Sequence, residues 1–302
     1  MRLGKVVVKE TFAEPFNMVY SRVIITADDS ELLGYALNSI TGFATSVILC
    51  PCEAGVDSYL PSSKTPDGRV GATVMLFAKD KDSLKKELDK RLSQCVLTTP
   101  TASVFNGLDE GEAVNTGRYI SFFGDGWQRK DKMFGRDVWV MPMLDGEFLI
   151  EDSFRIAEGV AGGNFIIIAG DKNSCLKAAK NAVLEIHKQP YVITSFPGGI
   201  CRSGSKPGSL KYKGMPASIN HRLCPSLKNI VADSELPEAA STVYEIVING
   251  SSIEAVSEAV KRGILAAAKV EGVLEITAAN YEGKLGSGRI YLKNLLDKGL
   301  SL

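Results

Sequence analysis

One carboxylate stands out among the residues whose type and position could do chemistry. Glu245 lies in the apolar stretch Val243–Asn249, and strand alternation puts it on the same face as Val243 and Val247. Burial between two valines would raise the pKa of this carboxyl and suit it to proton transfer near neutral pH. The alternative is a glutamate of an edge strand that faces water, and the strand pattern taken alone favours that alternative.

Glycines and cations form a second candidate site. Glycines recur in Gly159–Asn164, Phe196–Ile200 and Ser203–Ser209, where they would let the backbone approach a ligand closely. Exposed N–H groups in such turns suit anions. Positive charge lies nearby at Arg202, Lys206, Lys211 and Lys213. The stretch from about 195 to 231 has no clear secondary structure, and loops of that length are usually functional or disordered. The pattern fits a polar loop that binds no ligand equally well.

The composition excludes several kinds of chemistry. The chain has 302 residues, with 35 Lys plus Arg balanced by 35 Asp plus Glu, and two histidines, His187 and His221. The zero net charge argues against a nucleic-acid partner, and two histidines leave no room for a multi-His metal site. The sequence contains no dinucleotide fingerprint, Walker loop or nucleophile elbow.

The start of the chain and its cysteines indicate the cytoplasm. No apolar segment of a secretory signal follows Met1, and no stretch is long enough to span a membrane. We therefore expect a soluble, cytoplasmic protein without a membrane partner. In that compartment the six cysteines should be free thiols. Cys50-Pro51-Cys52 lacks the paired spacing of a zinc site.

The elements that would position these residues repeat four times. Four apolar strands are each followed by an amphipathic helix: Val23–Asp28, Thr73–Ala78, Phe165–Ala169 and Tyr244–Asn249. Four shorter strands are expected after those helices: Ser46–Leu49, Cys95–Leu97, Tyr191–Ile193 and Val273–Ile276. Two such units in a row make the βαββαβ ferredoxin-like arrangement. A doubly wound parallel sheet is the main alternative.

We therefore predict an α+β fold of two ferredoxin-like lobes related by internal duplication. The predicted domains are residues 1–150 and 151–302, the second with a long ligand loop over 195–231. Residues 100–150 do not fit the repeat, because Tyr119–Phe123 and Asp137–Pro142 suggest two strands around the charged stretch Gln128–Arg136. We predict an inserted β segment near 118–142 that covers a core or makes an oligomer contact.

Many short motifs, in order along the chain, match one known family. They are Thr11–Glu14, Thr41–Phe43, Thr45–Ile48, Cys50–Pro51, Glu53–Gly55, Thr65–Arg69, Pro100–Ser103, Ser121–Gly126, Glu151–Phe154, Gly159–Phe165, Phe196–Ile200, Pro216–Asn220, Tyr244–Gly250 and Gly283–Gly286. From about residue 10 to its end, the chain closely resembles the formylmethanofuran:tetrahydromethanopterin formyltransferases. Asn106–Gly117 and the charged stretch at 128–136 match poorly, which could alter subunit contacts.

The resemblance implies both a fold and a reaction. It implies two ferredoxin-like lobes in a homo-oligomer, typically a tetramer, with no prosthetic group and no metal. The family transfers a formyl group reversibly from formylmethanofuran to N5 of tetrahydromethanopterin, in the one-carbon metabolism of methanogenesis and related pathways. Two other functions stay open: a catalytically weak scaffold subunit of a formyltransferase/hydrolase complex, and a small-molecule-binding regulatory protein.

The resemblance also assigns residues. It makes Glu245 the catalytic group, which would manage the N5 proton of a tetrahedral intermediate. Hydroxyls or N–H groups near Ser153, Ser203 or Ser218 would hold the oxyanion. The residues expected to bind the two anionic coenzymes are Ser153, Phe154, Gly162, Gly163, Pro197, Gly198, Gly199, Ser203, Ser205, Lys206, Ala217, Ser218 and Asn220.

Overall fold

The computed structural model describes residues 1–281, 283 and 285–297. By their contacts these residues form two compact units, one of Met18–Gly159 and one of Met1–Asn17 together with the chain from Val160 onward. The chain passes between the units within two long strands, β4 (Phe16–Ala27) and β12 (Phe154–Ala169). The units differ from the predicted domains 1–150 and 151–302 in two places: residues 1–17 join the C-terminal half, and residues 151–159 join the N-terminal half.

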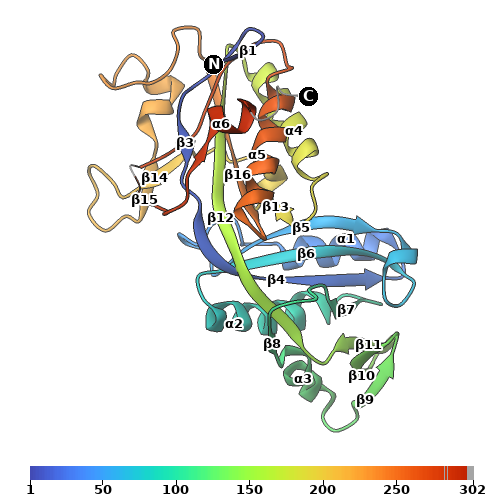
Figure 1. Cartoon of the computed structure of the whole chain (residues 1–302). Helices are drawn as coiled ribbons and strands as arrows, with labels where there is room; N and C mark the ends of the chain where they lie inside the picture. Colours follow the sequence, from blue (N-terminus) through green and yellow to red (C-terminus); the bar gives the residue numbers. More distant parts are fainter. Residues whose placement is uncertain (282, 284, 298–302) are drawn as a thin grey trace. The chain divides into compact units, whose positions relative to one another are not determined.

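The unit of residues 18–159 is built on an antiparallel sheet with two helices. Its elements follow the order β4, α1 (Ser30–Ile40), β5 (Glu53–Leu60), β6 (Val70–Ala78), α2 (Lys81–Arg91) and β7 (Ser103–Asn106). Neighbouring strands are antiparallel, in the order β5-β6-β4-β7, and Figure 1 shows β4, β5 and β6 side by side. Apolar side chains of the sheet and helices, including Val23, Val74, Leu84 and Leu88, share one core.

The predictions of two of the shorter strands, Ser46–Leu49 and Cys95–Leu97, are wrong. Ser46–Leu49 forms a turn, in which the Val47 amide donates to the buried Glu53 carboxylate at 3.0 Å, and the strand is β5 instead. Cys95–Leu97 is not a strand either, since Leu92–Val96 is a π-helical continuation of α2. Leu84, Leu88, Leu92 and Val96 are all fully buried at a spacing of four. Because buried residues continue at helical spacing past the end of α2, the next strand of the unit is β7.

The insertion begins with a helix where a strand was expected. Tyr119–Phe123 falls in α3 (Thr116–Ser121) and in a 3-10 turn over Phe122–Gly124. The buried residues are Thr116, Gly117, Ile120 and Ser121, which lie on one side of a helix. A β carbon on Gly117 would lie 1.8 Å from the carbonyl oxygen of Glu151, so glycine lets this helix pack closely.

The rest of the insertion is β structure, which confirms the predicted strand Asp137–Pro142, but the charged stretch that was expected only to join two strands also forms one. The charged stretch forms β9 (Arg129–Met133), which pairs with β10 (Arg136–Met143), and β10 pairs with β11 (Gly146–Glu151). Strand β11 then joins β7 in parallel. A short strand, β8 (Glu112–Val114), pairs with the start of β12.

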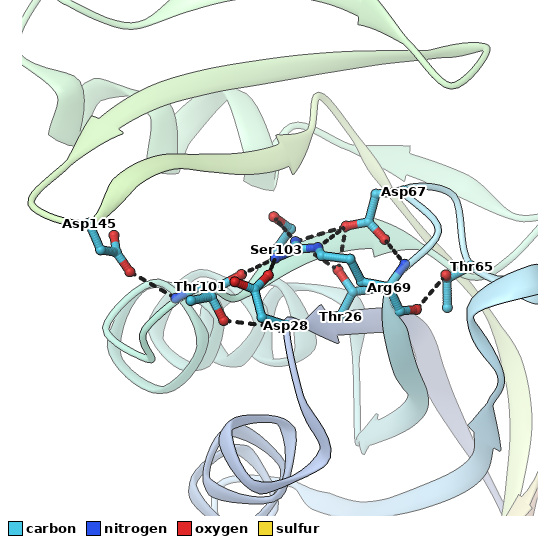
Figure 2. A network of polar contacts seen from close by, with 8 residues as sticks. All are labelled: Thr26, Asp28, Thr65, Asp67, Arg69, Thr101, Ser103 and Asp145. Carbon is cyan, nitrogen blue, oxygen red and sulfur yellow. Dashed lines mark hydrogen bonds and ion pairs between the residues drawn. The ribbon is translucent and has the colours of Figure 1, made fainter.

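A polar network ties together the ends of β4, β6 and β7. Figure 2 shows Arg69 at its centre. The guanidinium of Arg69 donates to Asp67 at 2.8 Å, to Asp28 at 2.9 Å and to the Ser103 hydroxyl at 2.8 Å. It also donates to the carbonyl of Thr101. The matched motifs Thr65–Arg69 and Pro100–Ser103 thus meet in one place.

The second unit repeats the same element order. It runs β12, α4 (Lys172–Ile186), β13 (Val192–Ile193), β16 (Thr242–Gly250), α5 (Ile253–Ala267) and β17 (Val273–Thr277). The strands are antiparallel in the order β17-β12-β16-β13, and β2 (Val6–Val8) adds to β17 in parallel, followed by β1 (Arg2–Leu3). These antiparallel pairings exclude the doubly wound parallel sheet and confirm the α+β class.

The helices of both repeats begin where the sequence provides a capping side chain. The carboxylates of Asp29, Asp80 and Asp171 accept hydrogen bonds from the first turns of α1, α2 and α4. The hydroxyl of Ser252 does the same for α5. Each cap satisfies an N–H group that lacks a partner within its helix.

The two faces of the second sheet have different coverings. Helices α4 and α5 lie side by side over one face (Figure 1), and Phe165, Ile167, Ile246 and Ile248 pack against them. Strand alternation sends Ile166, Ile168 and Val243 to the other face. There they pack with Leu223, Leu236 and Ala240 of the long connection between β13 and β16.

That connection contains the predicted ligand loop. It is not wholly irregular, because β14 (Ser205–Pro207) and β15 (Ala217–Ile219) form a short antiparallel hairpin. Figure 1 shows this hairpin on the side of the sheet away from α4 and α5. After β17, strand β18 (Ile290–Tyr291) pairs with β3 (Phe12–Ala13) of the N-terminal segment. Helix α6 (Leu292–Asp297) follows β18.

Two properties of the described chain bear on its chemistry. All six cysteines are unpaired. Among the helices that the structure describes, none combines the length and the hydrophobicity needed to cross a membrane.

Candidate active site

Glu245 lies on the loop-covered face of the second sheet. It sits opposite Ile166 in the β12–β16 pairing, and its neighbour Ile246 points to the helices. Its other flank is held by Cys201, because the two residues exchange backbone hydrogen bonds of 2.8 and 3.1 Å. Glu245 is therefore an interior residue with 9% of its surface exposed, and the edge-strand alternative is wrong.

Burial changes the acidity of this carboxyl. Loss of water raises the pKa of Glu245 from its ordinary value near 4.5 to about 7, and a hydrogen bond with the Cys201 side chain opposes that rise. In the part of the chain that the structure describes, no lysine or arginine contributes to the shift. A carboxyl with a pKa close to 7 exchanges protons readily near neutral pH.

Glu245 opens onto a small cavity. The cavity holds about 80 Å³. It is lined by Ile166, Cys201, Arg202, Ser203, Gly204, Ser205, Ile219, Asn220, Leu223, Cys224, Pro225, Val243, Glu245 and Ala279. Apolar walls surround one carboxyl and a few hydroxyl and amide groups, which is a usual composition for a reaction site.

A larger cavity of about 390 Å³ adjoins the first. The two share Asn220, Leu223 and Ala279. The larger one is lined by Lys9, Glu10, Thr11, Lys206, Asn220, Arg222, Leu223, Glu235, Glu275, Thr277, Ala278, Ala279, Asn280 and Tyr281. Its volume falls in the range of small-molecule sites. Together the two cavities place a wide, charged recess next to a narrow one that contains Glu245.

The β14–β15 hairpin positions a cation at the larger cavity. Lys206 faces Ser218 across the hairpin, and its Nζ donates to the Ser218 hydroxyl at 2.9 Å. That hydroxyl donates in turn to the carbonyl of Gly208 at 2.7 Å. Lys206 is thus held in place, whereas Lys211 and Lys213 are exposed in the loop that joins the two hairpin strands and line neither cavity.

Two motifs distant in sequence, Thr11–Glu14 and Gly283–Gly286, contact each other in this unit. The buried carboxylate of Glu14 accepts hydrogen bonds from the backbone amides of Gly283 and Leu285. Gly286 lies against Pro15 so closely that a β carbon would be 2.2 Å from the Pro15 carbonyl oxygen. This packing explains why glycine is needed at 286.

The predicted site residues are distributed over both units. Glu245, Ser203, Ser205, Lys206 and Asn220 line the two cavities. Ala217 and Ser218 lie in the hairpin strand that pairs with Ser205–Pro207. Ser153 and Phe154 belong to the other unit, and Phe154 is fully buried in its core. Phe154 therefore packs a core and does not offer its ring to a ligand.

The predicted glycines have different surroundings. A β carbon on Gly162 would lie 2.6 Å from Phe16, and one on Gly163 would lie 2.2 Å from Val256. A β carbon on Gly199 would lie 2.8 Å from Val183. Close packing thus explains all three glycines, and none of them lines either cavity. Gly198 has a φ of +62° with open space around it, and Pro197 beside it is exposed.

Several residues of the cavities were missed from the sequence. Cys201 and Tyr281 reach the site from the long connection and from the chain after β17. Lys9 and Thr11 come from the N-terminal segment. No local period links such distant positions, so the signal was limited to the matched motifs: Thr11 begins one of them, and Phe196–Ile200 ends just before Cys201.

Two sequence models of one protein family match the chain. The model described as "Formylmethanofuran-tetrahydromethanopterin formyltransferase" matches residues 1–143. The model described as "FTR, proximal lobe" matches residues 146–295.

Curated proteins and solved structures show the same similarity. The formylmethanofuran–tetrahydromethanopterin formyltransferases of Methanocaldococcus jannaschii and Methanopyrus kandleri are 47% and 48% identical to the chain, over 98% of it and 100% of each relative. The solved formyltransferase of Methanosarcina barkeri superposes with a TM-score of 0.95, at 43% identity over 98% of this chain and 100% of that one. The formyltransferase/hydrolase complex of Methylorubrum extorquens, solved with methylofuran, contains a chain with a TM-score of 0.93 and 39% identity, over 98% of both chains.

Proposed function

Since the chain belongs to the formylmethanofuran–tetrahydromethanopterin formyltransferase family, we propose that Glu245 is the residue that moves the proton during formyl transfer. The chain is an enzyme that passes a formyl group reversibly from formylmethanofuran to N5 of tetrahydromethanopterin, in one-carbon metabolism. Both coenzymes are substrates. The observation that carries the proposal is a buried carboxyl with a pKa near 7 on a cavity wall.

The reaction needs one group that accepts a proton and later returns it. The N5 nitrogen attacks the formyl carbon, the new N–C bond forms, and the Glu245 carboxylate takes the N5 proton. The tetrahedral intermediate then collapses, the C–N bond to the methanofuran amine breaks, and Glu245 gives the proton to that leaving amine. A pKa near 7 favours both transfers, because neither protonation state of Glu245 is strongly preferred at neutral pH.

The oxyanion of the intermediate needs a donor close to Glu245. Of the three predicted serines, Ser203 lines the cavity. The Ser218 hydroxyl already donates to the carbonyl of Gly208. We therefore favour the Ser203 hydroxyl for this task. Holding both coenzymes in a reactive geometry would supply much of the remaining rate.

The larger cavity is proposed to bind an anionic part of a coenzyme. The resemblance implies carboxylates on both coenzymes and a phosphodiester on the pterin coenzyme. Lys206 offers a fixed cation, with Ser205, Ser218 and Asn220 nearby as hydrogen-bonding groups. Ala217, Pro197 and Gly198 remain proposed contacts, the last two as an exposed turn.

Replacing Lys206 with alanine should weaken the binding of at least one coenzyme about tenfold at low salt, the loss expected for one charge-assisted contact of about 1.4 kcal/mol. The loss should shrink as salt is added, because exposed charges are screened. Isothermal titration calorimetry with each coenzyme at two salt concentrations measures these dissociation constants. Lys211→Ala is the matched control, since Lys211 is exposed on the same loop and lines neither cavity. Equal dissociation constants for both variants and the unaltered protein would contradict a role for Lys206.

The function is tested directly with purified protein and both coenzymes. N5-formyltetrahydromethanopterin should form from formylmethanofuran, and the reverse reaction should be measurable with the same protein. A protein that binds both coenzymes and makes no product would instead match the scaffold alternative. That alternative is not favoured, because relatives similar over their full length are named as the enzyme.

We propose the fold relationship, assembly and location as follows. The two units are ferredoxin-like lobes related by duplication, in line with their shared strand order. The chain forms a homo-oligomer, and exposed aromatics of the insertion support this: Phe122, Phe123 and Trp127 are 61%, 68% and 81% exposed. A related chain occurs in a formyltransferase/hydrolase complex, so subunits of that kind are further proposed partners. Six unpaired cysteines support a cytoplasmic location.

A further inference from the structure

Cys201 is the residue that the backbone holds directly beside Glu245. The two residues exchange both backbone hydrogen bonds, at 2.8 and 3.1 Å, as a single bridge between the long connection and β16. Such a bridge fixes both α carbons and points the two side chains to the same face. Only 2% of Cys201 is exposed, so its thiol shares the water-poor surroundings of the carboxyl.

The surroundings of the sulfur orient its single proton. The Ser203 hydroxyl lies 3.3 Å from the sulfur, and the backbone N–H groups of Ser203 and Gly204 oppose the rise that burial causes in the pKa of the thiol. A thiol has one hydrogen to donate, and that hydrogen is available for the Glu245 carboxylate. The hydrogen bond between the Cys201 and Glu245 side chains is the contact that opposes the effect of burial on Glu245.

We propose that Cys201 is a positioning residue that donates its S–H to the Glu245 carboxylate, fixing the orientation of this base and stabilising its charged form. The inference rests on the proposed function of Glu245 and adds a residue that neither the composition nor the matched motifs single out. Cys201 does not itself react. Burial and the charge of Glu245 both raise the pKa of the thiol, so it stays protonated near neutral pH and keeps the proton that it donates.

Other charged or titratable groups near Glu245 have different partners. The Tyr281 hydroxyl donates to the carbonyl of Ser205 at 2.7 Å, and burial together with the charges of Glu245 and Glu14 raises its pKa. The Cys224 sulfur lies 3.2 Å from the Ser226 hydroxyl. Arg202 lines the cavity and is largely exposed. Glu14 accepts from the backbone amides of Gly283 and Leu285.

The test compares Cys201→Ala, Cys201→Ser and the unaltered protein. Alanine removes the donor, so the pKa of Glu245 should rise by about 0.5 to 1. The acid limb of the turnover profile should then move to higher pH by the same amount. At pH 6 this lowers kcat about three- to tenfold, while kcat above pH 9 and the KM of both coenzymes stay unchanged. Serine keeps a donor and should restore most of the profile. Cys95→Ala, in the other unit, controls for loss of a thiol as such.

A second measurement separates this inference from the proposed function. Infrared or ¹³C titration of the free protein follows the Glu245 carboxyl without any turnover, and the signal is assigned by its loss in Glu245→Gln. A Glu245 pKa that is the same in Cys201→Ala and the unaltered protein would overturn the role of Cys201, whatever the activity. If Glu245→Gln is fully active, the proposed function of Glu245 fails instead, and the titration still reports whether Cys201 acts on the carboxyl.

Discussion

Replacing Glu245 with glutamine should lower the turnover number for formyl transfer by about a hundredfold or more, because positioned acid–base groups contribute about 10²- to 10⁴-fold. Glutamine keeps the shape and the hydrogen-bonding ends of the side chain, so both coenzymes should still bind with little change in their dissociation constants. The loss should appear in kcat, since the proton transfer belongs to the transition state and not to binding. Stopped-flow kinetics under saturating coenzymes would measure it.

The same variant carries its own folding control. The folded pKa of Glu245, about 7, lies above the ordinary value near 4.5. The native state therefore retains a proton that the unfolded state loses between pH 4.5 and 7, and stability falls as pH rises through this window. Glutamine removes that cost, so the variant should be more stable than the unaltered protein by up to about 3 kcal/mol at pH 8, and by less at pH 5. Urea unfolding at both pH values would show this.

One outcome of these measurements would contradict the role of Glu245, and another would require a different variant. Unchanged turnover in Glu245→Gln would remove the carboxyl from the mechanism. A variant that loses stability at pH 8 would make lost turnover uninformative, and Glu245→Asp would then be compared in its place. Glu271→Gln is the matched control, because Glu271 is an exposed glutamate of the same unit and its replacement should alter neither property.

The sequence predicted those features of the fold that depend on local periods. The helices at 172–186 and 253–267 follow from apolar residues at helical spacing. The strand of Glu245 was predicted from its apolar residues, and alternation placed Val243 and Glu245 on one face of it. Both residues line the same cavity. The spacing of apolar residues is set within a few positions, so a single sequence is enough to detect it.

The predictions failed where a short segment had no period of its own. Tyr119–Phe123 has the β-prone aromatics of a strand, yet close packing of Gly117 against Glu151 makes this segment a helix and a turn. Ser46–Leu49 has the apolar residues of a strand, but its backbone bonds to the Glu53 carboxylate. In both cases a tertiary contact outweighs intrinsic preference, which is worth at most about 1 kcal/mol per residue.

The site was harder to predict than the fold, for a related reason. Glu245 could be proposed because its type conflicts with its apolar strand. Cys201 could not, since a cysteine between Ile200 and Arg202 conflicts with nothing. Its position beside Glu245 depends on a bridge across 44 positions of the chain, counted from the residue numbers of that pair. Residues whose function depends on such a contact become visible only when the contact itself is known.

Replacing Arg69 with alanine should destabilise the unit of residues 18–159 by up to about 3–5 kcal/mol, the cost of leaving a buried carboxylate without its cation, although the Arg69 side chain itself is 26% exposed. The cost arises at Asp67, whose side chain is 4% exposed and accepts two guanidinium bonds, at 2.8 and 3.0 Å. The same guanidinium donates to Asp28, Ser103 and Thr101, so its loss also frees the ends of β4 and β7 (Figure 2). Hydrogen exchange in β4, β6 and β7, together with urea unfolding, would measure the effect.

Two further variants decide whether the buried carboxylate is the cause. Adding Asp67→Asn to Arg69→Ala removes the uncompensated charge, so the double variant should recover part of the lost stability. Arg129→Ala is the matched control within the same unit: its pair with Glu147 has a distance of 2.7 Å, but the side chains are 55% and 49% exposed. Exposed pairs contribute about 1 kcal/mol or less, so that variant should unfold close to the unaltered protein. If Arg69→Ala and Arg129→Ala lose the same free energy of unfolding, the network at Arg69 would contribute no more than an exposed ion pair. The contact between its two motifs would then need another explanation.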